Sequence, residues 1–183
     1  WVNVENAVAA VASVVCAARK RGEELDEELL REGLRSFSGV KRRFELYINT
    51  PRQVYMDDYA HHPEELEATI TSARRMFPDR KLTAVFQPHL YTRTRDLYRE
   101  FAAALSHADE VVLVPIYPAR EEPIEGVRSE LIGEHLTVGW SVCERENLAA
   151  NLAKAQTDVV ITFGAGNIDV YCQAIAEKKK KKA

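Results

Sequence analysis

The stretch LTAVFQPHLYTRTRD, residues 82–96, decides the fold of this chain. It begins with a short apolar run, passes through a polar junction and continues into residues with helical periodicity. Two further apolar runs, EVVLVPI (110–116) and DVVITF (158–163), have the same form. Short strands that alternate with helices predict an α/β fold with a mainly parallel sheet covered on both faces. The helical patterns fall at 63–77, 94–107, 129–136, 144–155 and 168–177.

The residues before this stretch predict a hairpin. RFELYIN (43–49) and RQVYMDD (52–58) alternate apolar and polar residues on either side of Thr50 and Pro51. Alternation at period two across a turn is typical of two antiparallel strands. The mainly parallel sheet should therefore begin with an antiparallel pair.

The chain opens with a pair of helices. Residues 4–20 and 26–36 show helical periodicity, with Gly22 as a stop and Asp26 as a cap. The pattern changes near Gly39. We therefore expect a helical part at 1–38, an α/β domain at 39–177 and a basic tail at 178–183.

Composition limits the classes of function. The 183 residues are 46% apolar and carry 25 basic and 28 acidic side chains, which predicts a soluble globular protein without the field that attracts nucleic acid. The apolar stretch 7–18 is too short to span a bilayer. The basic run 178–182 predicts a solvated tail. The three cysteines lie far apart, which favours neither disulfides nor a zinc site and fits a reducing cytoplasm.

Four polar or glycine-rich junctions follow the predicted strands. In a parallel sheet, ligands bind outside the carboxyl ends of the strands, so these junctions are where a site is expected. Four such junctions on one edge favour a binding site over chance. They are DDYAHHP (57–63), QPHLYTRTRD (87–96), PIYPAREEPIEG (115–126) and GAGNID (164–169).

The acidic and histidine residues of the first junction have structural alternatives. Asp57 and Asp58 can simply end a strand. His62 can cap a helix whose first residue is Pro63, and capping and chemistry are equally supported for it. Adjacent histidines cannot face one ion as an i, i+4 pair does, which argues against metal ligation by His61 with His62.

The other junctions are weighed in the same way. Arg93 and Arg95 open a helix, where an anion is welcome and a guanidinium binds carboxylate or phosphate in a fork. GAGN lacks the third glycine of a dinucleotide fingerprint and predicts a tight strand-to-helix turn. The sequence contains no GxxxxGK[ST] loop. Chemistry alone therefore predicts an α/β domain with an anion-binding edge.

Five segments resemble the carboxyl-terminal part of the Mur ligase family. The opening NVENAVAA (3–10) also resembles the helix that closes the family's central ATPase domain, with Val2 where histidine is expected. The five occur in the family's order and are GVKRRFE (39–45), DDYAHHPEE (57–65), VFQPHLYTRTRD (85–96), ADEVVLVPIYPAREEPIEGV (108–127) and FGAGNID (163–169).

The resemblance implies a particular place in a three-domain parent. The chain would hold the last helices of the central ATPase domain and the whole Rossmann-like carboxyl-terminal domain, with the P-loop and the magnesium ligands upstream of Trp1. The implied cofactors are ATP and magnesium, with no metal ligand in this chain. The fragment alone is expected to be inactive and to bind ATP feebly.

The resemblance also implies a reaction. In this branch of the family, ATP phosphorylates the carboxylate of UDP-N-acetylmuramate, and the amine of L-alanine attacks the acyl phosphate through a tetrahedral intermediate, releasing ADP and phosphate. The product is a peptidoglycan precursor for the cell wall. The implied enzyme is cytoplasmic, with neither nucleic acid nor membrane as a partner.

The family's nucleotide-binding residues carry over to four positions. Asp58 matches the aspartate that bonds the ATP ribose, and Arg43 matches an arginine that reaches the phosphates. Asn6 and Asn3 match the asparagine near adenine.

The catalytic positions carry over to a second set. Tyr59, His61, His89 and Arg93 match residues that face the acyl phosphate and the incoming alanine. Arg93 is the cation expected to bind the alanine carboxylate.

Two departures and two alternatives stay open. Leu90 stands where some relatives have arginine, and Asn167 replaces the aspartate of GAGD. A family ligase that recycles murein peptides is the alternative enzyme, against which the QPHLYTRTR segment argues. A non-catalytic nucleotide-binding or interaction module is the alternative outside the enzymes.

Overall fold

The computed structural model describes residues 2–37, 39–155 and 157–181 and divides the chain into two compact units, Trp1–Gly39 and Val40–Ala183. The first, the helical unit, contains α1 (Val2–Arg21) and α2 (Glu27–Ser36). Both predicted helices are confirmed. Asp26 caps α2, because its carboxylate accepts a hydrogen bond of 2.9 Å from the N–H of Leu29.

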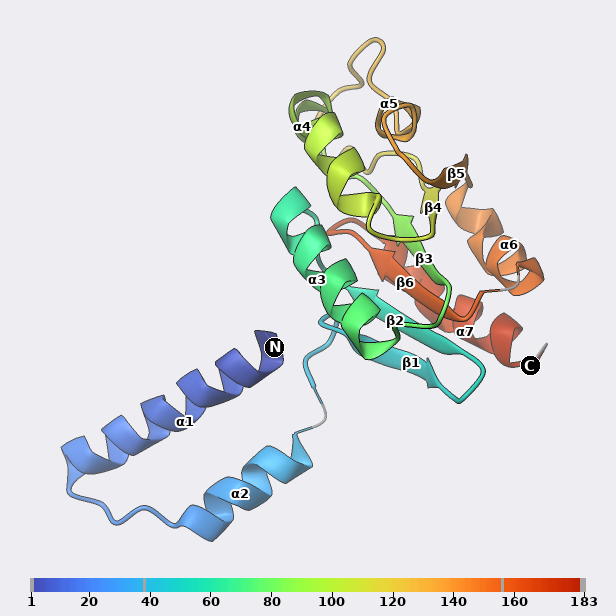
Figure 1. Cartoon of the computed structure of the whole chain (residues 1–183). Helices are drawn as coiled ribbons and strands as arrows, with labels where there is room; N and C mark the ends of the chain where they lie inside the picture. Colours follow the sequence, from blue (N-terminus) through green and yellow to red (C-terminus); the bar gives the residue numbers. More distant parts are fainter. Residues whose placement is uncertain (1, 38, 156, 182–183) are drawn as a thin grey trace. The chain divides into compact units, whose positions relative to one another are not determined.

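The second, the α/β unit, holds one six-stranded sheet in the order β1-β2-β6-β3-β4-β5 (Figure 1). Only β1 is antiparallel to its neighbour, and the other pairs are parallel. The expected hairpin and parallel sheet are confirmed. The elements are β1 (Glu45–Asn49), β2 (Val54–Asp58), α3 (Pro63–Met76), β3 (Leu82–Phe86), α4 (Tyr91–Leu105), β4 (Glu110–Leu113), α5 (Glu130–Gly133), β5 (Gly139–Val142), η1 (Arg145–Asn147), α6 (Leu148–Lys154), β6 (Val159–Phe163), η2 (Ile168–Tyr171) and α7 (Cys172–Lys180).

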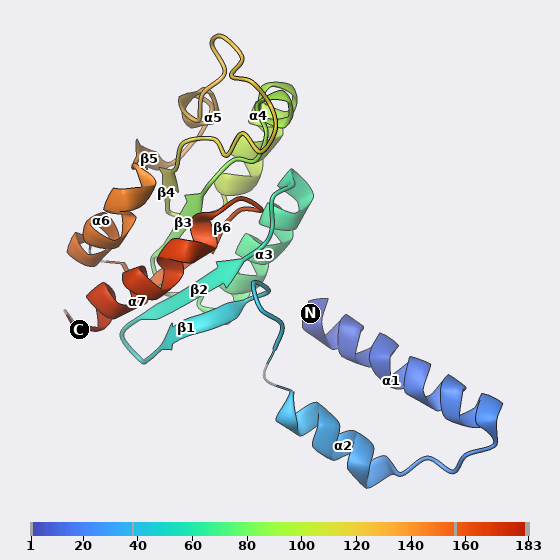
Figure 2. The same cartoon turned by 180° about the vertical axis from the view of Figure 1, so that it is seen from behind.

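Helices cover both faces of the sheet. Figures 1 and 2 show α3, α4 and α5 on one face and α6 and α7 on the other. Side chains alternate between the faces along each strand. In β6, Ile161 joins the cluster that contains Ile70 and Phe101, whereas Val160 joins the cluster that contains Leu152 and Ile175. Both faces of the central strands are thus buried.

Two elements differ from the sequence prediction because their local signals are weak. The edge strand β5 was not predicted, since its four residues are all exposed and form no apolar run. The helix predicted at 129–136 contains only four α-helical residues, Glu130–Gly133, and continues as tighter turns. Neither difference alters the strand order of the sheet centre.

The prediction of a solvated tail from residue 178 is wrong at its start. Helix α7 runs through Lys180, and Lys179 is 1% exposed. The Lys179 ammonium donates to the carbonyl of Leu152 and to the hydroxyl of Thr157, at 3.3 and 2.6 Å. A long lysine stem can pack under α6, which a pattern of charges does not reveal. Residues 182–183 lie outside the described residues.

Candidate functional site

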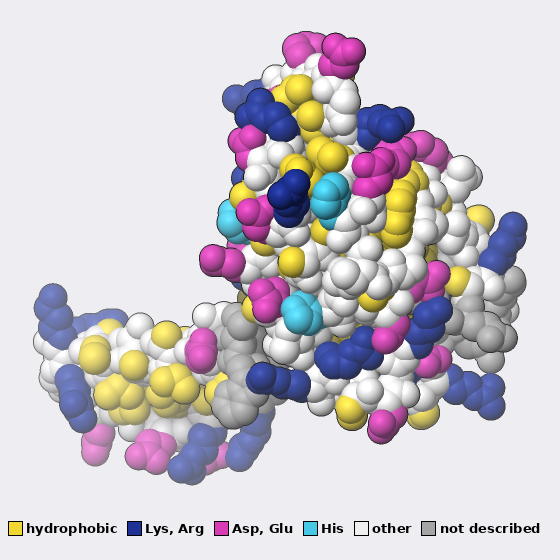
Figure 3. Space-filling view, turned by 45° about the horizontal axis from the view of Figure 1, so that its top comes forward, with side chains coloured by type: hydrophobic (Ala, Val, Ile, Leu, Met, Phe, Trp, Pro, Cys, Tyr) yellow, Lys and Arg dark blue, Asp and Glu magenta, His cyan; other side chains and the backbone are white. Residues whose placement is uncertain are grey.

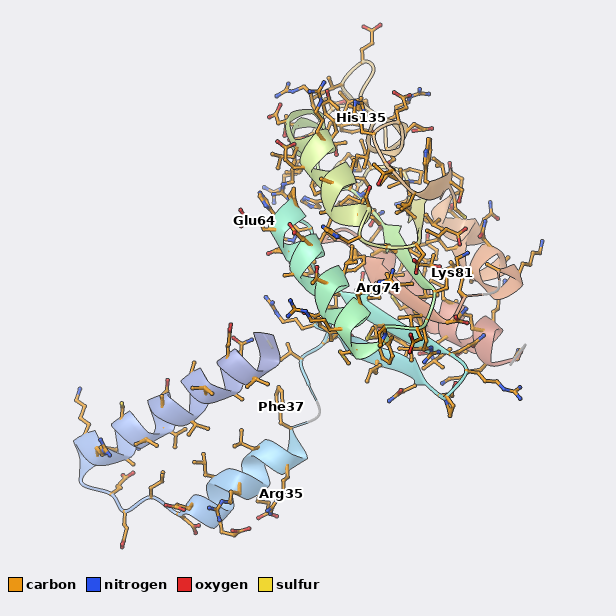
Figure 4. The ribbon with its side chains drawn as sticks, in the orientation of Figure 1. Arg35, Phe37, Glu64, Arg74, Lys81 and His135 are labelled. Carbon is orange, nitrogen blue, oxygen red and sulfur yellow. The ribbon has the colours of Figure 1, made fainter. Side chains whose placement is uncertain are left out.

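The carboxyl edge, where the parallel strands β2, β6, β3 and β4 end, gathers the four polar junctions. At the opposite edge the charges are paired: Arg74 contacts Asp109 at 2.8 Å, and Lys81 contacts Glu110 at 2.6 Å. Figure 4 shows Arg74 and Lys81 at that amino edge. The carboxyl edge contains buried polar atoms without partners, described below, and is therefore the candidate site.

Strand β2 ends in two buried carboxylates. Asp57 is fully buried and accepts a 2.7 Å hydrogen bond from the hydroxyl of Thr162 on β6. Asp58 accepts from the N–H groups of Phe44 and Ala60, at 3.0 and 2.9 Å. Burial is the largest influence on the Asp58 carboxyl and raises its pKa, against the lowering effect of those N–H donors. Asp57 therefore joins β2 to β6, and Asp58 fixes the backbone at Phe44 and Ala60 while keeping lone pairs for a further donor.

Arg42 links three loops at this edge. Its guanidinium contacts Asp57 at 3.1 Å, donates to the carbonyl of Gly164, and lies 3.8 Å from Asp169. Its guanidinium carbon also lies 5.0 Å from the ring centre of Tyr59. The side chain is only 13% exposed. Arg42 thus joins the start of the hairpin, the end of β2 and the turn after β6.

Four rings form a row across the edge. The ring centres of Tyr59 and His61 are 5.1 Å apart, those of His61 and His89 are 6.2 Å apart, and those of His89 and Tyr117 are 5.6 Å apart. The carbonyl of Tyr59 lies 3.0 Å from Nδ1 of His61. Three strands supply these rings, because they come from the junctions after β2, β3 and β4.

His89 and Arg93 each carry a buried polar atom that no described residue satisfies. Nδ1 of His89 and Nη1 of Arg93 have no hydrogen-bond partner within residues 2–37, 39–155 and 157–181. Burial lowers the pKa of His89, and the charge of Arg93 and then His61 lowers it further. A neutral imidazole beside an unpaired guanidinium suits an anionic group that also carries a proton to be held or moved.

The turn after β6 is packed too closely for side chains. A Cβ on Gly166 would lie 2.6 Å from Oε1 of Gln87 and 2.7 Å from Tyr117, and Gly164 has φ +145°. Asn167 then accepts hydrogen bonds from Gln87 and Arg145, both at 3.1 Å. Gly164 and Gly166 are therefore required by backbone conformation and close approach, which agrees with the predicted tight turn.

The predicted site residues fall into separate groups. The structure brings together the rings of Tyr59, His61 and His89. Arg93 lies near enough for its charge to lower the pKa of His89, in addition to the larger effect of burial. His62 is the residue before α3, and the carboxylate of Glu65 accepts from its N–H at 3.1 Å. The capping alternative for this junction therefore has structural support, through the backbone of His62.

The residues matched to ATP are divided between the two units, and the charge of Arg43 acts on Asp58 within the α/β unit. Arg43 is exposed, and among the described residues its side chain makes neither a hydrogen bond nor an ion pair. Asn6 is an exposed residue of α1, in the other unit. The side chain of Asn3 lies outside the described residues. These assignments stay predictions.

Sequence reasoning missed Arg42, Arg145 and Glu121. The carboxylate of Glu121 accepts from the N–H of Thr92 at 3.0 Å and also from its hydroxyl. Glu121 lies in the marked junction 115–126, and Arg42 is next to Arg43, whereas Arg145 lies outside the marked junctions. The partners of all three are distant in the sequence. The sequence shows that these side chains are charged, but it does not show which way they point.

Two further findings concern ions and membranes. Within residues 2–37, 39–155 and 157–181, no group of three or more histidine, cysteine or acidic side chains is placed to hold a metal ion. In the same ranges, no helix combines the length and the apolar content needed to cross a bilayer.

The structure is that of an α/β domain with a mainly parallel sheet, and its strand ends are the place where such domains bind ligands. Residues 42–166 match the family described as Mur ligase, glutamate ligase domain. The chain belongs to the Mur ligase family.

Relatives resemble the chain over nearly its whole length. A UDP-N-acetylmuramate--L-alanine ligase from Phocaeicola vulgatus is 50% identical over 183 residues, which cover 99% of this chain and 39% of that protein. One from Parabacteroides distasonis is 45% identical over 177 residues, or 96% of this chain and 37% of that protein. The chain thus spans about two-fifths of the length of these relatives.

A solved structure supports the same likeness. The UDP-N-acetylmuramate-alanine ligase from Thermotoga maritima has a TM-score of 0.76 and 27% identity, covering 100% of this chain and 39% of that chain. A murein peptide ligase from Psychrobacter arcticus, at 21% identity and a TM-score of 0.63, shares the fold.

Proposed function

We propose that this chain is the carboxyl-terminal part of an ATP-dependent ligase that joins L-alanine to UDP-N-acetylmuramate. The observation that carries the proposal is 50% identity to a ligase of that name over 99% of the chain. The unpaired atoms of His89 and Arg93 support it from the structure, since an amino acid offers a carboxylate to a cation. A cytoplasmic location and involvement in cell-wall precursor synthesis accompany the proposal.

Arg93 is the proposed partner of the alanine carboxylate. Arg93 lies in the first turn of α4, at the carboxyl edge of the sheet. Its Nη1 atom is buried and has no hydrogen-bond partner among the described residues. A buried donor without a partner forms a new hydrogen bond when an anion binds beside it, so this position favours the binding of a carboxylate. His89, His61 and Tyr59 line the same edge and would face the amine and the acyl phosphate that it attacks.

Arg43 and Asp58 are the proposed ATP contacts of the α/β unit, with Asn6 and Asn3 in the helical unit. Asp58 fits a ribose because its two oxygens have lone pairs beyond those used by Phe44 and Ala60. ATP, when bound, supplies the phosphoryl group that activates the carboxylate. Magnesium would need ligands from outside the described residues.

The helical unit is proposed to be the end of the central ATPase domain. Its exposed apolar side chains, among them Val8 and Leu29, would pack against the rest of that domain. Hydrogen exchange would test this: amides of α1 and α2 should exchange more slowly in a full-length ligase than in this chain. Equal exchange in both proteins would contradict the assignment.

Steady-state kinetics of a full-length ligase that carries this α/β unit test the function. Arg93→Ala should raise the KM for L-alanine roughly ten- to a hundredfold, the cost of losing a charged hydrogen-bond partner, and leave the KM for ATP nearly unchanged. Arg93→Lys should recover only part, because an ammonium lacks the fork. Arg43→Ala should instead lower kcat and weaken ATP.

Arg99→Ala is the matched control, since Arg99 is exposed on the same helix. Arg93→Ala that damaged only the use of ATP would show the carboxylate assignment to be wrong. An unsubstituted enzyme that ligated a peptide and not L-alanine would favour the murein-recycling alternative.

A further inference from the structure

We propose that Glu121 is a positioning residue that holds His89 and Arg93 in place for the amino-acid substrate. Glu121 lies on the loop after β4, whereas His89 and Arg93 lie at the junction after β3. The inference rests on the proposed function, in which the latter two face the amino acid. The two loops are distant in the sequence, and no sequence pattern predicts a contact between them.

The first contact is a paired one. Oε2 of Glu121 accepts from the N–H of Thr92 at 3.0 Å, and Oε1 accepts from the Thr92 hydroxyl. Thr92 directly precedes Arg93 in the first turn of α4. One carboxylate thus fixes both the backbone and the side chain of the residue next to Arg93.

The second contact lies at the other end of the same segment. The N–H of Leu90 donates to the carbonyl of Tyr117 at 2.9 Å, and the N–H of Tyr117 donates to the carbonyl of Pro88 at 2.8 Å. The Tyr117 ring stacks on His89. Residues 88–92 are therefore hydrogen-bonded along residues 117–121, and we call this pair of segments the strap. Glu121 makes the contact of the strap that lies nearest to Arg93.

The strapped segment holds an unusual backbone. Leu90 has φ +75°, a region that residues with a side chain rarely adopt. Such a conformation persists where surrounding contacts hold it, and here the Tyr117 carbonyl and the Thr94 donors do so. The turn at Leu90 sets the direction in which the chain enters α4.

The functional side chains depend on this backbone. Nδ1 of His89 and Nη1 of Arg93 have no partner in the described part of the chain, so those atoms are not tied in place. Their positions follow from the segment that carries them. Loosening the contact between Glu121 and Thr92 should therefore displace both, even though Glu121 touches neither of their unpaired atoms.

The charge of Glu121 supplies a second readout. The charged groups that act on His89 are Arg93 and His61, which lower its pKa, and Glu121, which raises it. The hydrogen bonds from Thr92 lower the pKa of Glu121, so it is ionised at neutral pH. Removing this charge should lower the pKa of His89 further.

Nuclear magnetic resonance of the 183-residue chain tests the strap directly. In Glu121→Gln, the Thr92 amide should exchange roughly ten- to a hundredfold faster, the expected loss for a hydrogen bond to a charged group, and the pKa of His89 should fall. Glu122→Gln is the matched control, because Glu122 is the exposed next residue and should leave both unchanged. Unchanged exchange and pKa in Glu121→Gln would overturn the inference.

Kinetics of the full-length ligase complete the test. Glu121→Gln should raise the KM for L-alanine several-fold, with the KM for ATP unchanged, and Glu122→Gln should have no effect. Equal losses for both substrates, together with a lowered melting temperature, would indicate a general structural role and overturn the positioning role. An unsubstituted enzyme that does not use L-alanine would refute the proposed function instead, and the resonance measurements would still decide the strap.

Discussion

The helical unit and the α/β unit of this chain differ in what they bury. Among the described residues of the helical unit, Ala18 is the one apolar side chain in the buried class, whereas Leu29 is 67% exposed and Phe37 is 61% exposed. The α/β unit buries large side chains completely, including Phe86 and Phe163. One unit therefore has a core, and the other has an apolar surface.

The apolar side chains of the helical unit line a groove between its two helices. A groove of about 650 Å³ runs between α1 and α2, and Figure 3 shows hydrophobic side chains along this unit. Helices of this length owe most of their stability to packing of an apolar face. The α/β unit therefore has a core of its own, whereas the helical unit leaves exposed much of the apolar surface on which such helices depend for packing. The groove is lined mainly by Ala10, Val11, Val14, Ala17, Ala18, Leu25, Leu29, Leu30 and Leu34.

The first way to break this comparison is to truncate a large side chain in each unit. Phe101 is 1% exposed and packs on Phe86, with ring centres 5.1 Å apart. Phe101→Ala should lower the free energy of unfolding by about 3–5 kcal/mol. Leu29→Ala, at an exposed site, should change it by less than about 0.5 kcal/mol. Urea unfolding measures both, and equal effects would show that the helical unit has a core of its own.

The second compares two arginines. Arg42 pairs with the fully buried Asp57, so Arg42→Ala leaves a buried carboxylate without its cation and should cost about 3 kcal/mol. Arg31 pairs with Glu27 and Glu28 at 3.4 and 3.5 Å on the surface of α2. Arg31→Ala should cost less than about 1 kcal/mol. A small loss for Arg42→Ala in the same unfolding experiment would mean that the loops hold without the clamp.

The third prediction concerns the local stability of helix α2 in the helical unit. Asp26→Ala removes the cap of α2 and should destabilise that helix by about 1 kcal/mol, because the Leu29 N–H loses its acceptor. Circular dichroism should show lost helix content with the main unfolding transition unchanged. Glu32→Ala, at an exposed position inside α2, is the control. A shift of the main transition would show that the two units unfold together.

The smallest expected effect is the contribution of histidine to the pH dependence of the free energy of unfolding. It arises in the α/β unit, because the helical unit has no histidine. The folded-state pKa of His89 is lowered, so the unfolded chain takes up a proton first as the pH falls through about 6.5. The contribution to stability is therefore present above that pH and lost below it. His89→Gln should reduce the loss of stability between pH 7.5 and 5.5, measured by urea unfolding. His135→Gln, at an exposed position, should not.

Much of the fold follows from local sequence. The runs at 82–87, 110–116 and 158–163 became β3, β4 and β6, because short apolar segments between helical patterns can be satisfied only as buried strands of one sheet. Strand β5 escaped prediction, since an exposed edge strand needs no apolar run. The buried Lys179 escaped for the related reason that burial of a long side chain depends on what packs over it.

The sequence by itself determined most of the elements, and it placed His61, His89 and Arg93 at the carboxyl edge of the parallel strands. Only the tertiary structure decided which neighbouring charges turn inward. Arg42 and Arg43 are adjacent, yet Arg42 reaches Asp57 and Gly164 because the backbone has φ +59° at Arg42 and +49° at Phe44. Glu121 meets Thr92 across 29 residues because parallel strands bring their carboxyl ends together. Side-chain direction in such loops is fixed by distant partners, and so local sequence cannot specify it.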